Sequence, residues 1–213
     1  LQSESQLEMA RAAEGLSRRR AMVLLEKHAS ITTDIARGQT LDMRSEDMDY
    51  LQVGPRFYYH MIRLKTAVLF AHACWTGAYI AGAGERFSEK AKSFGLNLGM
   101  AFQMADDILG LVGDPRVTGK PTGSDVRNGK KTMPILVALK NLSGPDRAQL
   151  LEKLKARDPS AIDLIVKGSG IDYTKNYMLR FRSKAEAALK GMPRGPALEE
   201  ISKLLDSAVV REK

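Results

Sequence analysis

Two adjacent aspartates, Asp106 and Asp107, lie in the middle of a segment that is otherwise apolar, residues 99–112. The segment leaves no broad polar face, which is typical of a buried helix. A buried carboxylate must be protonated, hydrogen-bonded or bound to a metal, because an unpaired charge is costly there. Gln103 precedes the pair by three and four residues and therefore shares a helix face with it. The pattern predicts a divalent-cation site, Mg²⁺ or alternatively Mn²⁺, at Asp106 and Asp107.

A glycine-rich basic loop follows the aspartates over residues 113–131. Next to an acidic helix, its cations can bind an anion that a metal also binds, and we interpret that anion as a diphosphate. The loop is not a P-loop, because no strand precedes it and Pro121 follows Lys120 where Ser or Thr would stand. The basic residues of the loop are Arg116, Lys120, Arg127, Lys130 and Lys131.

Lys65 and Thr66 open a long apolar stretch, residues 67–84. The Lys65 ammonium could snorkel to solvent or reach a phosphate inside a bundle, and the sequence alone leaves both open. The stretch is about as long as a membrane span, but polar residues such as His72 and Thr76 interrupt it. We therefore predict a buried helix of a protein that is not transmembrane.

The histidines and the cysteine indicate structural roles. His28, His60 and His72 show none of the spacings of a zinc site, and the single Cys74 excludes an intrachain disulfide. Lack of a disulfide framework favours a reducing compartment, and we expect a cytoplasmic protein. The net charge of +8 fits nucleic acid, an anionic membrane or anionic substrates, but only 6% of residues are aromatic and no nucleic-acid motif occurs. Nucleic acid is therefore not expected as a partner.

The elements that position these residues are predicted to be helices, because apolar residues recur at three- and four-residue spacing. We predict one all-α domain over residues 1–213, with seven to nine helices. Gly38 is expected to end the first long stretch, and Ser45 to cap a short helix that starts at Glu46. The predicted helices span residues 7–37 with a break near 15–17, 46–53, 56–83, 88–112, 135–141, 146–156, 160–167, 171–189 and 196–211.

Taken together, these motifs resemble those of the trans-isoprenyl diphosphate synthases, also called polyprenyl synthetases, which include the farnesyl and geranylgeranyl diphosphate synthases. The resemblance covers about residues 20–211, in matching order and approximate spacing. It implies an antiparallel helical bundle of the isoprenoid synthase type around a deep pocket, usually in a homodimer. The motifs are Gly38 and Gln39 with Asp42, Lys65 and Thr66, Phe102 and Gln103 with Asp106 and Asp107, and Gly119 and Lys120 with Asp125, Gly129, Lys130 and Thr132.

The resemblance implies a Mg²⁺-dependent prenyltransferase. Such enzymes condense an allylic diphosphate with isopentenyl diphosphate, releasing pyrophosphate and forming a longer polyprenyl diphosphate. By resemblance, Asp106 is a Mg²⁺ ligand that Asp107 supports, while Asp125, Lys130 and Lys131 hold or close the loop. The implied catalytic residues are Lys65, Thr66, Gln103 and Lys120, and the implied diphosphate-binding residues are Lys65, Gln103, Lys120 and Lys130.

Two departures from the family pattern bear on activity. Gly110 stands where the second aspartate-rich motif commonly has a third aspartate, so water or Asp114 would replace that contact. The family's first aspartate-rich motif is absent, the chain is shorter than typical members, and it starts at Leu1. We therefore expect the N-terminal helices to be missing, and a chain that truly began here not to elongate prenyl chains. A non-catalytic subunit or scaffold and a class I terpene cyclase remain alternatives, and product length is not predicted.

Overall fold

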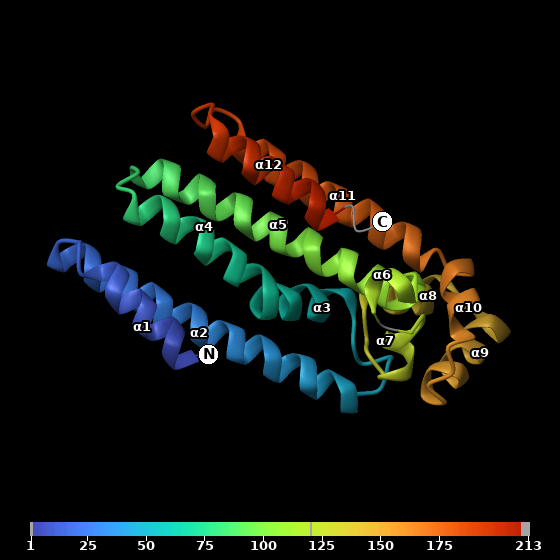
Figure 1. The fold of residues 1–213 in the computed structure, drawn as a ribbon. Coiled ribbons are helices and arrows are strands. Elements are labelled where there is room, and N and C mark those ends of the chain that lie inside the picture. The colour runs from blue at the N-terminus through green and yellow to red at the C-terminus, as the bar shows by residue number, and fades with distance from the viewer. Residues whose placement is uncertain (1, 120, 210–213) are drawn as a thin grey trace.

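The computed structural model describes residues 2–119 and 121–209 and, within them, consists of helices joined by turns, without a strand. The predicted all-α class is confirmed. Long helices run side by side as an elongated bundle, and the short helices α6 to α10 gather at one end (Figure 1). The helices are α1 (Gln2–Ala13), α2 (Arg18–Asp47), α3 (Pro55–Ile62), α4 (Val68–Ile80), α5 (Glu85–Val112), α6 (Pro115–Thr118), α7 (Ser124–Arg127), α8 (Met133–Asn141), α9 (Gly144–Lys155), α10 (Ala161–Lys167), α11 (Gly170–Leu189) and α12 (Pro196–Val209).

The end of α2 differs from the prediction. Gly38 does not terminate the helix, which continues to Asp47, so no separate helix starts at Glu46 and the buried Ser45 lies within α2. A glycine inside a helix costs about 1 kcal/mol relative to alanine. The reason for it here is close packing, because a Cβ at Gly38 would lie 2.2 Å from the backbone nitrogen of Lys65. The predicted break between α1 and α2 is confirmed.

The predicted helix over residues 56–83 is confirmed, with an unpredicted irregularity. Between α3 and α4, a π-helical segment designated η1 spans Arg63–Ala67 and includes Lys65 and Thr66. Short π-helical segments inside α-helices are rare and occur frequently at functional sites. The number of helices also exceeds the predicted seven to nine, because residues 113–129 contain α6 and α7 and because η1 divides one predicted helix.

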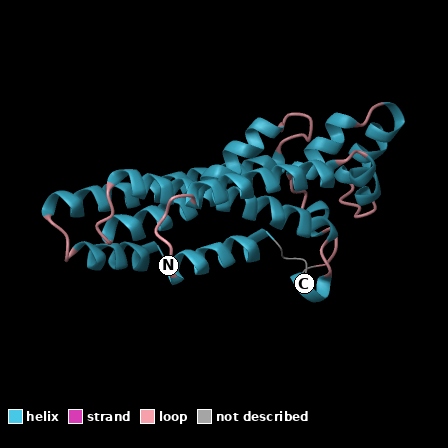
Figure 2. Cartoon of the chain, turned by 90° about the horizontal axis from the view of Figure 1, so that it is seen from above, coloured by secondary structure: helices cyan, strands magenta, loops and turns pink. Residues whose placement is uncertain are grey.

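Helix α5 is the centre of the bundle and packs extensively against both α4 and α11. The main core lies along it and includes fully buried side chains such as Tyr58, Phe94, Leu98 and Met104. A second core joins the end of α5 to the short helices, and a third joins α1 and α2 to Trp75 of α4. The view from above shows the long helices running lengthwise together along the bundle (Figure 2). Among the described residues, no helix is long and apolar enough to cross a membrane.

Candidate active site

A chain of hydrogen bonds crosses the C-terminal half of α5. The Thr66 hydroxyl donates to Oε1 of Gln103 over 2.8 Å, and Nε2 of Gln103 donates to Oδ1 of Asp107 over 3.0 Å. The Tyr58 hydroxyl donates to the other oxygen of Asp107. Asp107 therefore holds the Gln103 amide with its carbonyl oxygen directed toward Thr66. This relay brings together three residues that the sequence predicted and one, Tyr58, that it did not.

Asp107 lies deep in this relay and is only 4% exposed. Burial raises its pKa to about 7, and the negative charges of Asp125 and Asp106 act in the same direction. The hydrogen bonds from Tyr58 and Gln103 lower the pKa in opposition. Asp106, its neighbour on α5, is partly exposed. The pair thus divides into a buried carboxyl with two protein donors and an accessible carboxylate.

Beside the relay lies an ionic cluster between α2, η1 and the loop before α8. The buried Asp42 carboxylate accepts from Nζ of Lys65 at 2.6 Å and lies 3.3 Å from Nζ of Lys130. Lys130 also binds Glu46 at 2.5 Å. Burial disfavours the charged form of Lys130, but its contacts with Glu46 and Asp42 together outweigh burial and raise its pKa. Both lysines stay partly exposed, so their ammonium groups remain accessible to an anion.

Gly38 and the π-helical segment determine where Lys65 and Thr66 lie. The extra residue in a π turn shifts the side chains that follow relative to an α-helix. Because Gly38 lacks a Cβ, α2 can approach the backbone of Leu64 and Lys65 directly. Asp42 lies one turn after Gly38 on the same face of α2, which places its carboxylate at the Lys65 ammonium. Local backbone geometry thus assembles the contact between α2 and η1.

The position of the missing third aspartate is filled by another carboxylate. A Cβ on Gly110 would lie 2.5 Å from Oδ2 and 2.6 Å from Oδ1 of Asp125, which comes from α7. Asp114, the predicted substitute, instead caps α6 and contacts Arg116. Asp125 therefore brings a carboxylate to the place on α5 where the family motif has its own. Its charge also raises the pKa of Asp107.

The donor set has the chemistry that Mg²⁺ prefers, since Asp106, Asp107 and Asp125 supply hard oxygens. No group of three or more His, Cys, Asp or Glu within residues 2–119 and 121–209 is arranged to hold a metal by itself. Mg²⁺ bound to one or two carboxylates usually completes its coordination with water and substrate phosphates. The site therefore fits Mg²⁺ that binds together with a diphosphate. Lys120 lies outside the described residues, so its predicted contact stays a prediction.

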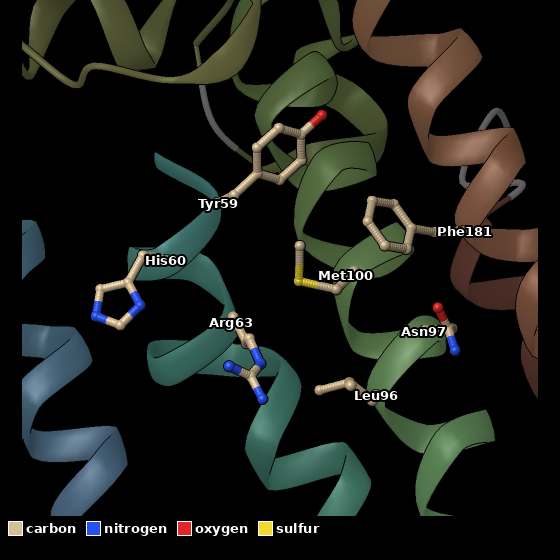
Figure 3. Close-up of a pocket in the computed structure, with 7 residues that line it drawn as sticks. All are labelled: Tyr59, His60, Arg63, Leu96, Asn97, Met100 and Phe181. Atoms are coloured by element: carbon tan, nitrogen blue, oxygen red, sulfur yellow. The ribbon is translucent and has the colours of Figure 1, made fainter. Parts of the chain in front are cut away.

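An apolar cavity of about 470 Å³ lies further along α5. Figure 3 shows Met100 of α5 between Tyr59 of α3 and Phe181 of α11, with Leu96 and Arg63 below them. Its volume falls within the range of about 300–1,000 Å³ that is usual for small-molecule pockets. Because Met100 precedes Gln103 by three residues on α5, the cavity starts one helical turn from the relay.

Sequence reasoning missed the partners of the predicted residues. It gave no role to Tyr58, Glu46 or Asp42, although Asp42 belonged to a recognised motif. A helical signal was present for two of them. Asp42 follows Gly38 by four residues and Glu46 follows it by eight, so both share a helix face with that motif residue.

Comparison with known proteins gives one family. The polyprenyl synthetase family profile matches residues 4–167. The geranylfarnesyl diphosphate synthase of Aeropyrum pernix is 36% identical over 206 residues, which cover 93% of this chain and 63% of that protein. The geranylgeranyl diphosphate synthase of Sulfolobus acidocaldarius is 36% identical over 71% of this chain and 47% of its own length. This chain thus spans between 47% and 63% of these two relatives.

Solved structures of polyprenyl synthases share the fold of this chain. The geranylgeranyl pyrophosphate synthetase of Pyrococcus horikoshii superposes with a TM-score of 0.85 and 30% identity, over 94% of this chain and 62% of that one. The polyprenyl synthase of Caulobacter crescentus, solved in complex with calcium and isoprenyl diphosphate, gives 0.78 and 36% identity, over 92% and 60%. The family profile, the sequence relatives and the fold converge, and the chain belongs to the polyprenyl synthetase family.

Proposed function

We propose that this chain forms the allylic-diphosphate side of a Mg²⁺-dependent prenyltransferase, which condenses an allylic diphosphate with isopentenyl diphosphate and releases pyrophosphate. The observation that carries the proposal is the juxtaposition of two clusters at one end of α5. The relay Thr66–Gln103–Asp107–Tyr58 adjoins the ionic cluster Asp42–Lys65–Lys130–Glu46 through the neighbouring residues Lys65 and Thr66. Neither the scaffold nor the terpene cyclase alternative is favoured by a specific contact.

The ionic cluster supplies the charge for leaving-group stabilisation. In the absence of substrate, Lys65 and Lys130 are neutralised by Asp42 and Glu46. We infer that a diphosphate attracts both ammonium groups, and that Lys120 adds a third cation. Preorganised cations stabilise the negative charge that develops on the departing pyrophosphate. Mg²⁺ held by Asp106, with Asp107 and Asp125 behind it, would neutralise further charge on the same group.

The relay supplies the groups that face the reacting carbon. Because Nε2 of Gln103 donates to Asp107, its carbonyl oxygen is fixed on the side of Thr66. An oriented carbonyl dipole and a hydroxyl oxygen stabilise an allylic cation without reacting with it as a charged nucleophile would. The cavity at Met100 and Phe181 offers an apolar surface for a prenyl chain. These contacts support a partition in which the diphosphate lies by η1 and hydrocarbon lies along α5.

The homodimer stays a prediction, and one face of α2 supports it. This exposed face carries small or apolar side chains at an average spacing close to 3.5 residues, as in a helix–helix seam. The hydroxyls of Thr33 and Thr40 donate to the carbonyls of Ala29 and Ala36, so their methyl groups are the outward apolar surface. The residues are Met22, Leu25, Ala29, Thr33, Ala36, Thr40 and Met43. Sedimentation of a Thr33→Glu, Ala36→Glu variant against wild type tests this interface.

The function is tested by binding and turnover in the full-length protein. We expect pyrophosphate to bind in calorimetry when Mg²⁺ is present and to bind far more weakly with EDTA. We also expect labelled isopentenyl diphosphate to enter a longer product when an allylic primer is added. Binding without Mg²⁺ at equal affinity would remove the metal assignment. Absence of product from intact, Mg²⁺-loaded protein with all short allylic primers would support the scaffold. The single cysteine supports a cytoplasmic location, which fractionation can test.

A further inference from the structure

Lys131 is buried directly beside the ionic cluster but takes no part in it. Its side chain is only 4% exposed. The Nζ atom donates to the backbone carbonyl of Glu46 over 3.0 Å and to that of Gly129 over 3.5 Å. It also lies 4.6 Å from the centre of the Tyr50 ring. The cation therefore binds carbonyl oxygens and an aromatic face, whereas Lys130 binds carboxylates.

These partners are those that hold a buried cation in place. The Glu46 carbonyl belongs to the last turn of α2, where unpaired carbonyls and the helix dipole favour positive charge. An aromatic face adds attraction that grows when the pair is removed from water. Burial nevertheless lowers the pKa of Lys131, while the charges of Glu46, Asp47 and Asp49 raise it and that of Arg157 lowers it. A lysine in this setting does not swing freely to a substrate.

The backbone around Lys131 links it to two residues of the proposed active site. The amide of Lys130 donates to the carbonyl of Asp125 over 2.9 Å, and the amide of Gly129 donates to that of Val126 over 3.1 Å. Gly129 adopts a positive φ of 67°, which a side chain would strain. The segment from Asp125 to Lys131 is thus a tight turn, and Lys131 attaches its end to α2. At its other end, the Asp125 carboxylate lies against Gly110.

We propose that Lys131 is a positioning residue, which anchors this turn to the end of α2 and so sets where Lys130 and Asp125 meet the metal–diphosphate group. The proposal rests on the proposed function. Lys130 must turn its ammonium toward a diphosphate from its position between Asp42 and Glu46, so its backbone must stay in place while its side chain adjusts. Lys131 provides that fixed backbone, because its own contacts are with carbonyls and a ring that an anionic ligand does not replace.

The test uses the full-length protein and calorimetric titration of pyrophosphate with Mg²⁺. We expect Lys131→Met to weaken binding roughly tenfold, because it removes hydrogen bonds from a charged group. Lys131→Arg keeps a cation that can donate to carbonyls and stack on a ring, so it should restore most of the affinity. The matched control is Lys27→Met, which removes a lysine 4.9 Å from the Trp75 ring, away from the site. It should leave pyrophosphate affinity unchanged.

Steady-state kinetics separates positioning from general stability. Lys131→Met should raise KM for the allylic diphosphate while KM for isopentenyl diphosphate stays within about twofold. A folded Lys131→Met variant with wild-type affinity and KM overturns the inference, even if its melting temperature falls. If Lys131→Met does not fold, Tyr50→Leu is tested instead. We expect loss of the ring to weaken pyrophosphate binding about threefold. Wild-type affinity in Tyr50→Leu would also overturn the inference. Failure of wild type itself to bind Mg²⁺ and pyrophosphate would instead contradict the proposed function.

Discussion

The two halves of α2 meet the neighbouring helix through different chemistry. The C-terminal half contacts η1 through Gly38 and the ion pair of Asp42 with Lys65. The N-terminal half contacts α4 through rings: Nδ1 of His28 lies 3.3 Å from Nε2 of His72, and Trp75 of α4 packs in one core cluster with Leu24 of α2. Figure 1 shows α2 lying alongside α3 and α4, and both contacts are made along this pair of rods.

This difference separates contacts that an anionic ligand can join from contacts that it cannot. The partly exposed ammonium group of Lys65 can bind a phosphate beside Asp42, because carboxylate and phosphate oxygens are equivalent partners for an ammonium group. Packed rings have no such equivalent in a small anionic ligand. We therefore expect the contact between the N-terminal half of α2 and α4 to stay unchanged when substrate binds. The contact between the C-terminal half of α2 and η1 is the one that substrate can change.

The largest expected effect is on turnover. Asp106→Asn in the full-length protein should lower prenyl transfer at least about a hundredfold, because it removes the accessible carboxylate of the proposed Mg²⁺ site. Circular dichroism should show the helical content unchanged. Asp163→Asn is the matched control, since it removes one exposed acid from α10. Near-normal turnover of Asp106→Asn would show that Asp106 is not a ligand of a catalytic metal.

A close helix contact makes Gly38→Ala the next strongest change. The new Cβ would lie 2.2 Å from the Lys65 nitrogen, so the two helices must separate. Overpacking of this kind typically costs about 1–3 kcal/mol, and displacement of Lys65 should also weaken pyrophosphate binding. Gly77→Ala in α4 is the matched control, because nothing lies within 4 Å of its Cβ. That variant should gain up to about 1 kcal/mol of helix propensity. Equal urea midpoints for both variants would contradict the packing argument.

Gly110→Asp tests whether Asp125 replaces the third aspartate. It restores the common family motif, yet we expect a loss of activity of roughly tenfold, because its Cβ would lie 2.5 Å from the Asp125 carboxylate and a second negative charge would adjoin Asp107. Combining it with Asp125→Gly removes the collision and should recover part of the loss. Prenyl transfer by the single and double variants provides the measurement. Higher activity of Gly110→Asp alone would show that the two carboxylates are not alternatives.

Sequence patterns predicted the elements whose periodicity is strong. The apolar helix that carries Asp106 and Asp107 and the helical run through Lys65 were predictable, since both bury residues at three- and four-residue spacing. Gly38 was misinterpreted because a glycine that ends a helix and one that admits a neighbouring backbone look alike in sequence. Only the close approach of the Lys65 backbone to Gly38 shows which of these two roles the glycine has.

The partners within the site were less predictable than its motifs. Tyr58 and Asp107 are 49 residues apart, and their contact depends on how α3 packs on α5. Asp125 reaches Gly110 through a loop whose turns include glycines with positive φ, at Gly119 and Gly123. No periodicity operates in such a loop, so its geometry could not be read from spacing. Spacing therefore identified the motif residues, whereas the contacts that orient them depend on tertiary packing.

The smallest expected effect concerns the aromatic end of α2. Burial lowers the pKa of His72 to about 4, and the charges of His28 and Lys27 act in the same direction. The unfolded chain, with an ordinary histidine pKa near 6.5, therefore binds more protons between about pH 6.5 and pH 4. The free energy of unfolding should fall as pH falls through this window, by about 2 kcal/mol. His72→Gln should flatten that slope in urea unfolding measured from pH 7 to pH 4. If wild type and His72→Gln show the same slope, His72 is not the titrating group. The contact between α2 and α4 then does not depend on a neutral histidine.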